Sequence, residues 1–535
     1  MEKENRSCNI RWPLHAALAA LLITASAPVP MGAQQPGSRP PFDVVEADIA
    51  GIHAAMLART LTCRSLVEQY LRRIAAYDRN GPAINSIIVV NPRVLADADI
   101  LDRRFTIEGL TGPLHCIPLI VKDNFETAGL ATTAGSLSLE GLIPERDAFM
   151  VKRLRDAGAL VLAKSNLAEF AFTPYETVSS ILPGYTRNPY DLSRVTAGSS
   201  GGTAAAVAAS MGTAGLGTDT GNSIRGPSSH LALVGVRSTM GLTSRAGIAP
   251  LNLGADIAGP IARTVADAAA VFQAIVGEDP DDTVTARSRG RPIPTYSDAL
   301  RADGLRGARI GVFTQAYLSP TTDPEVVRVF DAAIADLRKA GAIVIDSAII
   351  GDLDSLRRTA RGCNSFKHDI EEWLARHGER APVRTVEEIL GSRRYHPLYQ
   401  ARLEAAQAES LPPATRPSCA LRDSFRVALR ASVLEVMARH RLDALVYPTW
   451  SNVPRLTGDL NTPHGDNNQL FSPSTGFPAI TVPMGFTRGG TLPAGLQFFG
   501  RPWSEETLFR LSFAYEQATN HRRPPSTTPP LRDGG

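Results

Sequence analysis

The chain has 535 residues, of which 43% are hydrophobic, so it is long enough to bury a large core. Its 56 Lys and Arg residues nearly balance 53 Asp and Glu residues, and no long basic run carries interleaved aromatic residues, which argues against a nucleic acid partner. Beyond the N-terminal segment, no stretch approaches the ~20 apolar residues of a spanning helix, so no stable membrane association is expected once that segment is removed.

The first 33 residues have the pattern of a secretory signal peptide. Lys3, Arg6 and Arg11 precede an apolar stretch at residues 16–27, and small residues and prolines follow it. Cleavage is expected at the end of this segment, after Ala33. A retained membrane anchor is the alternative, although the apolar run is short for a spanning helix. The mature protein is therefore expected to be secreted or periplasmic.

Four cysteines remain once the segment 1–33 is removed: Cys63, Cys116, Cys363 and Cys419. Their wide separation and the lack of a C-x-x-C pair exclude a zinc ribbon and a dense disulfide framework. In an oxidising compartment one pair could join, and Cys363 with Cys419 is the first candidate. Four buried free thiols are the alternative.

Residues 34–41 form a Pro/Gly-rich flexible linker, and strand and helix patterns alternate from there to residue 520. Short β-branched apolar runs predict strands at residues 84–90, 114–121, 160–163, 231–236, 309–313, 343–345, 442–447 and 480–482. Helical periodicity lies between many of them, at residues 148–157, 264–275, 324–340 and 505–519. This alternation predicts an α/β fold over residues 42–520, with a large central sheet covered by helices on both faces.

Two segments depart from the alternation. Residues 353–422 are charged, mostly helical in pattern and poor in strand signal. We interpret them as a helical insertion that overhangs a pocket and helps to select substrates, with a purely solvent-facing decoration as the alternative. Residues 521–535 are rich in Pro, Arg and Thr and predict a C-terminal surface coil.

Two glycine-flanked serine sites lie close together within residues 196–225. One is GSSGG at 198–202 and the other is DTGNS at 219–223, with an alanine-rich run between them. Glycine lets the backbone turn sharply and brings its N–H groups close to a bound atom. A serine hydroxyl beside such N–H groups is suited to acyl transfer. Ordinary Gly/Ser turns explain either site alone, but both in one segment favour a catalytic function.

A serine nucleophile needs a base, and the sequence offers no clear histidine for this role. GSSGG matches the G-x-S-x-G elbow of α/β-hydrolases, but residues 191–196 are polar where a buried strand should precede it. His464 and His521 lie in loop-like, proline-bearing surroundings. Lys122 is the stronger candidate, because it ends an apolar run and α/β sites commonly lie at strand ends. An ion-pair partner is the alternative for a lone lysine.

Several separated segments resemble the amidase signature family. They read CIPLIVKDN, TAGSSGGTAAAVAA, GTDTGNSIRGP and GLTSRAGIAP followed by DIAGPIARTVADAA, and the likeness continues to GFPAITVPMGF and LPAGLQFFGR. The resemblance covers nearly the whole chain after residue 33, with residues 353–422 the least familiar part. It implies a single domain of the amidase signature fold, with a mixed sheet, and no metal or organic cofactor.

Residue by residue, the resemblance implies a Ser–cis-Ser–Lys triad. Ser223 would be the nucleophile, Ser199 the bridging serine on a non-proline cis peptide, and Lys122 the base. Ser200 would be a supporting hydroxyl. The implied oxyanion hole consists of the backbone N–H groups of Thr220, Gly221, Asn222 and Ser223.

Lys122 can act as a base only when its amine is neutral, whereas an ordinary lysine has a pKa of about 10.4. Burial and the positive end of a helix expected after Gly202 should lower this pKa to roughly 7–8. Lys122 would then take a proton from Ser199, and Ser199 from Ser223, as Ser223 attacks an amide carbonyl.

The chain departs from the commonest family pattern just before the nucleophile, where many members have two glycines and this chain has Gly221 and Asn222. Asparagine tolerates unusual backbone angles better than most residues, so the oxyanion hole is expected to survive. The Asn222 side chain is expected to narrow the acyl pocket or to hydrogen-bond to substrate. Asp219 and Arg225 flank the loop as a structural brace, with a contact from Arg225 to a substrate carboxylate as the alternative.

These observations predict an exported amidase that hydrolyses a small-molecule carboxylic amide to an acid and ammonia or an amine through a seryl acyl-enzyme. Phe172, Tyr175 and Trp450 are candidates for an aromatic pocket that favours aryl or hydrophobic amides, although ordinary packing also explains each of them. Esters, peptide amides and carbamates stay open as substrates, as does a homo-oligomeric state. The alternatives are the glutaminase (A) subunit of a tRNA-dependent amidotransferase and a non-catalytic binding protein on the same scaffold.

Overall fold

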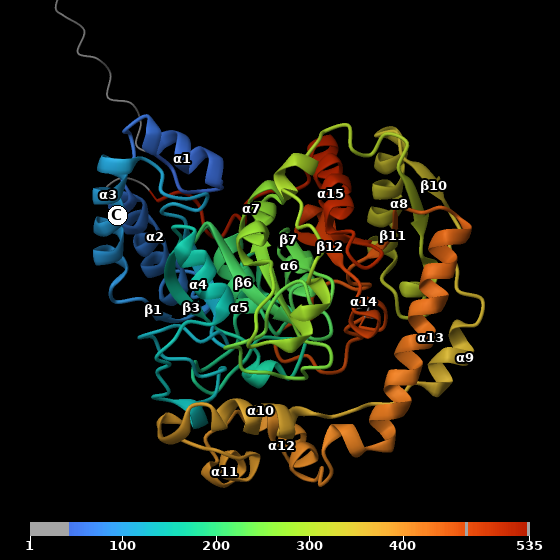
Figure 1. Cartoon of the computed structure of the whole chain (residues 1–535). Coiled ribbons are helices and arrows are strands. Elements are labelled where there is room, and N and C mark those ends of the chain that lie inside the picture. The colour runs from blue at the N-terminus through green and yellow to red at the C-terminus, as the bar shows by residue number, and fades with distance from the viewer. Residues whose placement is uncertain (1–41, 466–468, 532–535) are drawn as a thin grey trace, which may run out of the picture. The chain divides into compact units, whose positions relative to one another are not determined.

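An eleven-stranded mixed sheet organises the part of the chain that the computed structural model describes, residues 42–465 and 469–531 (Figure 1). The strands are β1 (Ile87–Val90), β2 (Pro118–Lys122), β3 (Leu160–Ser165), β6 (Ala214–Asp219), β7 (Val234–Arg237), β8 (Ile257–Ala262), β9 (Arg309–Val312), β10 (Ile343–Ile345), β11 (Ala444–Pro448), β12 (Ala479–Thr487) and β13 (Leu492–Phe499). Their order in the sheet is β1-β3-β2-β6-β8-β7-β12-β13-β11-β9-β10. Strands β4 (Arg187–Asn188) and β5 (Asp191–Val195) form a separate hairpin.

The sheet is parallel where β2 pairs with β3 and β6, and where β9 pairs with β10 and β11, and it is antiparallel elsewhere. Helices flank it (Figure 1). They are α1 (Ile49–Leu57), α2 (Cys63–Ile74), α3 (Val94–Glu108), α4 (Phe149–Asp156), α5 (Gly201–Ala208), α6 (Arg225–His230), α7 (Val265–Ile275), α8 (Pro324–Lys339) and α15 (Glu505–Thr519). The predicted α/β fold with a large mixed sheet is confirmed.

Most predicted elements have a counterpart, but the strand pattern does not predict β6, β8 or β13. Each of these strands contains glycine, and β8 and β13 also contain proline, so their β-propensity is low. In β6 the glycine is a packing requirement, because a Cβ at Gly217 would lie 2.8 Å from the Ser200 hydroxyl oxygen. The contact with Ser200, rather than the β-propensity of the residue, therefore requires glycine at position 217.

Residues 353–422 contain four helices and the start of a fifth. These are α9 (Leu353–Thr359), α10 (Phe366–Ala375), α11 (Val386–Ser392), α12 (Gln400–Gln407) and α13 (Pro417–Arg439), and a short α14 (Phe471–Thr475) packs against α13. The boundary at residue 422 falls inside α13, because that helix continues for several turns beyond it.

Helix α10 packs against the protein through a second hydrophobic cluster. The ring of Phe366 lies 4.6 Å from that of Phe172 and 5.6 Å from that of Phe170, measured between centroids. Trp373 is also buried, and its indole N–H donates to a Glu126 carboxylate oxygen at 2.8 Å. This segment is therefore not a purely solvent-facing decoration.

Both cysteine pairs are disulfides in the structure: Cys63 with Cys116 and Cys363 with Cys419. The pair that the sequence analysis names first is present, and the alternative of four free thiols is wrong. The first bond joins the start of α2 to the segment before β2, and the second joins the segment before α10 to the first turn of α13.

The ends of the chain fall largely outside this description. Residues 1–33 and the linker 34–41 lie outside the described residues, as do the last four of the tail. Residues 521–531 are coil, but Thr528 is buried and its carbonyl accepts a hydrogen bond from Arg73 at 2.8 Å, so this part of the tail is docked rather than a free surface coil. Within the described ranges, no helix is both long enough and apolar enough to cross a bilayer.

Candidate active site

The three predicted catalytic side chains come from neighbouring places in the fold. Lys122 is the last residue of β2, Ser199 lies just before α5, and Ser223 follows β6, the strand that pairs with β2. Lys122 and Ser199 are fully buried, and Ser223 is 4% exposed. The fold therefore gathers residues that are far apart in the sequence at one end of two adjacent strands.

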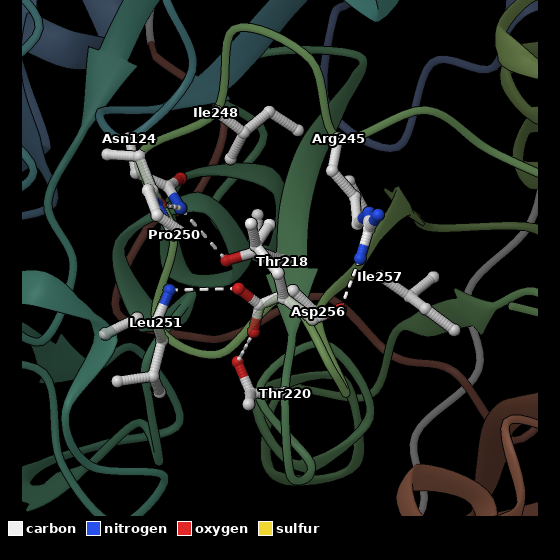
Figure 2. Close-up of a pocket in the computed structure, with 13 residues that line it drawn as sticks. Asn124, Thr218, Thr220, Arg245, Ile248, Pro250, Leu251, Asp256 and Ile257 are labelled. Atoms are coloured by element: carbon white, nitrogen blue, oxygen red, sulfur yellow. Dashed lines mark hydrogen bonds between the residues drawn. The ribbon is translucent and has the colours of Figure 1, made fainter. Parts of the chain in front are cut away.

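The Lys122 amine makes two short contacts. Its Nζ lies 2.7 Å from Ser199 Oγ and 2.6 Å from Thr218 Oγ1. Thr218 also accepts a hydrogen bond from the Asn124 side chain at 3.2 Å (Figure 2). Thr218 is a site residue that the sequence motifs do not predict, although it directly precedes the second serine site and its side chain faces the lysine.

Burial lowers the pKa of Lys122 to about 7, and the carboxylates of Asp256 and Asp219 only partly oppose this effect. The helix expected after Gly202 is present as α5, which begins at Gly201, two residues after Ser199. A substantial fraction of the Lys122 side chain is therefore a neutral amine at neutral pH, as proton acceptance requires.

The two serine sites are joined through their backbones. The peptide bond between Gly198 and Ser199 is cis, which confirms what the family resemblance implies. The next residue, Ser200, donates its backbone N–H to the carbonyl of Ser223 at 3.2 Å and its hydroxyl to the carbonyl of Thr218 at 3.1 Å. Ser200 is thus a supporting residue that holds the first serine loop against β6 and the second serine loop.

The hydroxyl of Ser223 forms no hydrogen bond to Ser199, or to any other residue that the structure describes. The Lys122–Ser199 half of the predicted relay is therefore present, and the Ser199–Ser223 half is not formed. Catalytic hydrogen bonds are often long or unaligned without substrate and tighten in the complex.

The loop before Ser223 presents unused donors. The backbone N–H groups of Gly221, Asn222 and Ser223 donate to no acceptor within residues 42–465 and 469–531. Gly221 packs tightly, because a Cβ there would lie 2.5 Å from Gln469 Oε1. Unpaired N–H groups in a loop next to a serine hydroxyl can stabilise a developing oxyanion.

The expectations for Asn222 need correction. Neither Gly221 nor Asn222 has a positive φ, so tolerance of unusual backbone angles is not what this position requires. The Asn222 side chain is fully buried and donates to the carbonyl of Thr449 at 3.3 Å. The amide nitrogen is therefore held by the residue that follows β11, whereas the buried Oδ1 has no hydrogen-bond partner among the described residues.

A buried ion-pair network holds the loop. Asp219 lies 3.0 Å from both Arg225 and Arg237, and all three side chains are fully buried. Burial opposes ionisation of Asp219, but the two guanidinium groups outweigh it and lower its pKa to about 2. Arg225 also donates to the carbonyl of Gly221 at 2.7 Å and to Gln497 at 2.9 Å. These contacts use the Arg225 guanidinium group to hold the loop, as the predicted brace requires.

The predicted aromatic pocket is mostly protein core. Phe172 belongs to the cluster under α10, and Trp450 is 4% exposed with its ring packed against Gly226. Tyr175 alone of the three is partly exposed, and its ring stacks on His464 with centroids 3.9 Å apart. The structure therefore leaves one of the three predicted aromatic residues on a cavity wall.

Two hollows adjoin the serine loops. A narrow pocket is lined by Thr218, a partner of the Lys122 amine, by Asn124, which donates to Thr218, and by Asp256, which accepts backbone hydrogen bonds from residues 251 and 252 (Figure 2). A larger cavity of about 490 Å³ is lined by Tyr175 and Gln469 among others. Asp256 is a second site residue that the sequence analysis misses. No cluster of side chains in the described part of the chain has the composition to hold a metal ion.

Comparisons with known proteins cover most of the chain. A family model described as amidase matches residues 65–509. A probable amidase of Arabidopsis thaliana is 33% identical, over 90% of this chain and 92% of the relative, and a glutamyl-tRNA(Gln) amidotransferase subunit of Synechococcus is 32% identical, over 91% and 95%. The structure of a peptide amidase from Stenotrophomonas maltophilia is similar with a TM-score of 0.80 and 39% identity, over 90% of this chain and 99% of that one.

Replacing Asp219 with Asn tests the brace. The change leaves two buried guanidinium groups without a carboxylate, so the free energy of unfolding should fall by about 3–5 kcal/mol. Urea denaturation followed by circular dichroism measures this. The control is Asp191→Asn, whose partly exposed ion pair with Arg194 should be worth no more than about 1 kcal/mol. Equal losses in the two variants would contradict a structural role for the network.

Proposed function

The chain belongs to the amidase signature family and is a hydrolase of carbon–nitrogen bonds, and from this premise we propose that Ser223 is its nucleophile, Ser199 its proton bridge and Lys122 its base. The supporting observation is the 2.7 Å contact between the Ser199 hydroxyl and a fully buried amine whose pKa is about 7. A buried lysine beside a serine, with no acid of the described residues in direct contact, is chemically suited to accept a proton.

The proposed reaction begins with neutral Lys122. Its two N–H bonds and one lone pair can be shared so that Thr218 accepts a hydrogen bond while the lone pair faces Ser199. Ser199 gives its proton to this lone pair and takes the proton of Ser223, whose oxygen then bonds to the amide carbonyl carbon. The free N–H groups of residues 221–223 stabilise the resulting oxyanion.

The second half of the reaction uses the same groups in reverse. The proton on Lys122 returns through Ser199 to the leaving nitrogen, the C–N bond breaks, and ammonia or an amine departs. Water then attacks the ester formed on Ser223, and its proton passes to Lys122 by the same route. The bond between the acyl carbon and Ser223 Oγ then breaks, the proton on Lys122 returns through Ser199 to that oxygen, and release of the acid restores the starting state.

The substrate that we propose is a peptide amide or a similarly polar carboxylic amide. The likeness to a peptide amidase supports it, since 39% identity extends over 99% of that chain. The cavity beside the loop supports it too, because Phe172 and Trp450 are packed in the core and so do not provide the aromatic wall that a preference for aryl amides would favour.

A glutaminase subunit is the second candidate, because a glutamyl-tRNA(Gln) amidotransferase subunit of Synechococcus is 32% identical over 95% of its length. We favour an exported amidase over it for two reasons. The first 33 residues have the pattern of a signal peptide, and the structure carries two disulfides, which persist in oxidising compartments.

Export can be tested on the protein made in a Gram-negative host. The mature chain should be recovered from the periplasm or medium and should begin at Gln34, because the signal peptidase would cut after Ala33. Intact mass and N-terminal sequencing measure this. A full-length chain in the cytoplasm would favour the amidotransferase subunit, and a full-length chain in the membrane fraction would indicate a retained anchor.

Removing the nucleophile or the base should nearly abolish turnover. Ser223→Ala and Lys122→Ala should each lower kcat for N-acetyl-phenylalaninamide by about 10³–10⁶, with a milder loss for Ser199→Ala. Release of ammonia measures the rate, and Ser193→Ala, an exposed serine of β5, is the control. A fluorophosphonate probe should label Ser223 alone. Full activity of Ser223→Ala or labelling at Ser200 would overturn the assignment.

The pH dependence should report Lys122. Because the neutral amine is the active form, kcat/KM should rise with pH to a plateau above a midpoint of about 7, changing about tenfold per pH unit below it. Burial also raises the pKa of Glu169 to about 7, so Glu169→Gln is the matched control and should keep the same midpoint. A flat profile, or a midpoint that disappears in Glu169→Gln, would remove Lys122 as the base.

A further inference from the structure

The 490 Å³ cavity beside the nucleophile loop has a basic wall. Arg422 and Arg426, four residues apart on α13, line it together with Arg361 from the segment between α9 and α10. The two guanidinium groups of α13 converge, since a Cβ placed on Gly254 would lie 3.3 Å from Nη1 of each. The described lining of this cavity contains no Asp or Glu.

The positive charge of this wall is poorly balanced. The side chains of Arg422 and Arg426 are only 16% and 13% exposed. Their shared carboxylate, Asp423, is 60% exposed and lies 2.9 Å from Arg422 but 3.8 Å from Arg426. Burial and the neighbouring Arg422 lower the pKa of Arg426 to about 10. Two largely buried arginines that share a single, mostly solvated acid, close to only one of them, favour an anionic ligand.

Gln469 lies between this cavity and the loop of the proposed nucleophile. This side chain lines the cavity and lies directly against Gly221, two residues before Ser223. Asn252 lines it as well, and the backbone N–H of Asn252 donates to Asp256, whose carboxylate also contacts the Thr220 hydroxyl. An acyl group attached to Ser223 that extends past Gln469 would therefore enter the space in front of the arginines.

Resting on the proposed function, we propose that this cavity binds a carboxylate carried by the acyl half of the substrate, through Arg422 and Arg426. The substrate class is then an amidated peptide with an acidic side chain upstream of the terminal amide. A guanidinium group suits this ligand, because its planar donors match both oxygens of a carboxylate. Residues 353–422 and the rest of α13 would in this way supply recognition, while the sheet supplies chemistry.

A pair of nearly isosteric amides tests the proposal. For the wild-type enzyme at low salt, kcat/KM for N-acetyl-Glu-Phe-amide should exceed that for N-acetyl-Gln-Phe-amide by about tenfold or more, mainly through KM. Arg422→Gln and Arg426→Gln should each reduce this ratio to less than about threefold. Arg439→Gln, the same change at an exposed site on α13, is the control and should keep the wild-type ratio. The ratio is insensitive to the fraction of each variant that folds.

Calorimetric binding of the same two amides to Ser223→Ala separates this inference from the proposed function. Ser223→Ala should bind the Glu amide selectively, and Ser223→Ala/Arg426→Gln should lose this selectivity; that outcome supports the inference. If the wild-type enzyme then hydrolyses neither amide, the inference stands but the proposed function is contradicted. Hydrolysis of both amides at equal rates would uphold the proposed function and overturn the inference. Equal binding of the two amides, or a ratio unchanged by either arginine substitution, would also overturn it.

Discussion

The proposed chemistry depends on the complete burial of one lysine amine. In solution a lysine is charged at neutral pH, and complete burial of Lys122 lowers its pKa to about 7. The register of the sheet places its partner, because Val121 of β2 lies opposite Leu216 of β6 and so brings Lys122 beside Thr218. Its described partners are hydroxyl groups rather than a carboxylate, so no directly bonded negative charge stabilises the protonated form.

Close packing around β6 provides this dry environment. Gly217 leaves room for Ser200, and Ser200 in turn bonds to the backbone of both Thr218 and Ser223. The Asp219 network then holds the following loop through two buried guanidinium groups, one of which donates to the Gly221 carbonyl. Buried ion pairs contribute little net stability, so their value here is the fixed geometry of a loop with free N–H groups.

The proposed chemistry and the proposed substrate recognition come from different parts of the chain. The proposed catalytic groups lie on β2, before α5 and after β6, in the region of the family resemblance. The basic wall of the neighbouring cavity comes from α13 and the segment before α10, where that resemblance is weakest. With this division, substitutions in the helical region can change the substrate preference while the sheet and the proposed triad stay the same.

From the sequence alone, β-branched runs and helical periodicity predicted the α/β class and most elements. The spaced motifs predicted Lys122, Ser199 and Ser223 as the catalytic residues. Both kinds of signal are local in the sequence. Only the tertiary structure decided which glycine-rich segments are strands and that both cysteine pairs form disulfides. It also placed Thr218 and Asp256 in the candidate site and showed that Phe172 and Trp450 are packed in the core. It also brought Arg422 and Arg426 to the cavity that adjoins the nucleophile loop. Each of these depends on contacts between residues distant in the chain, and such contacts follow from how the elements pack rather than from the residues beside them.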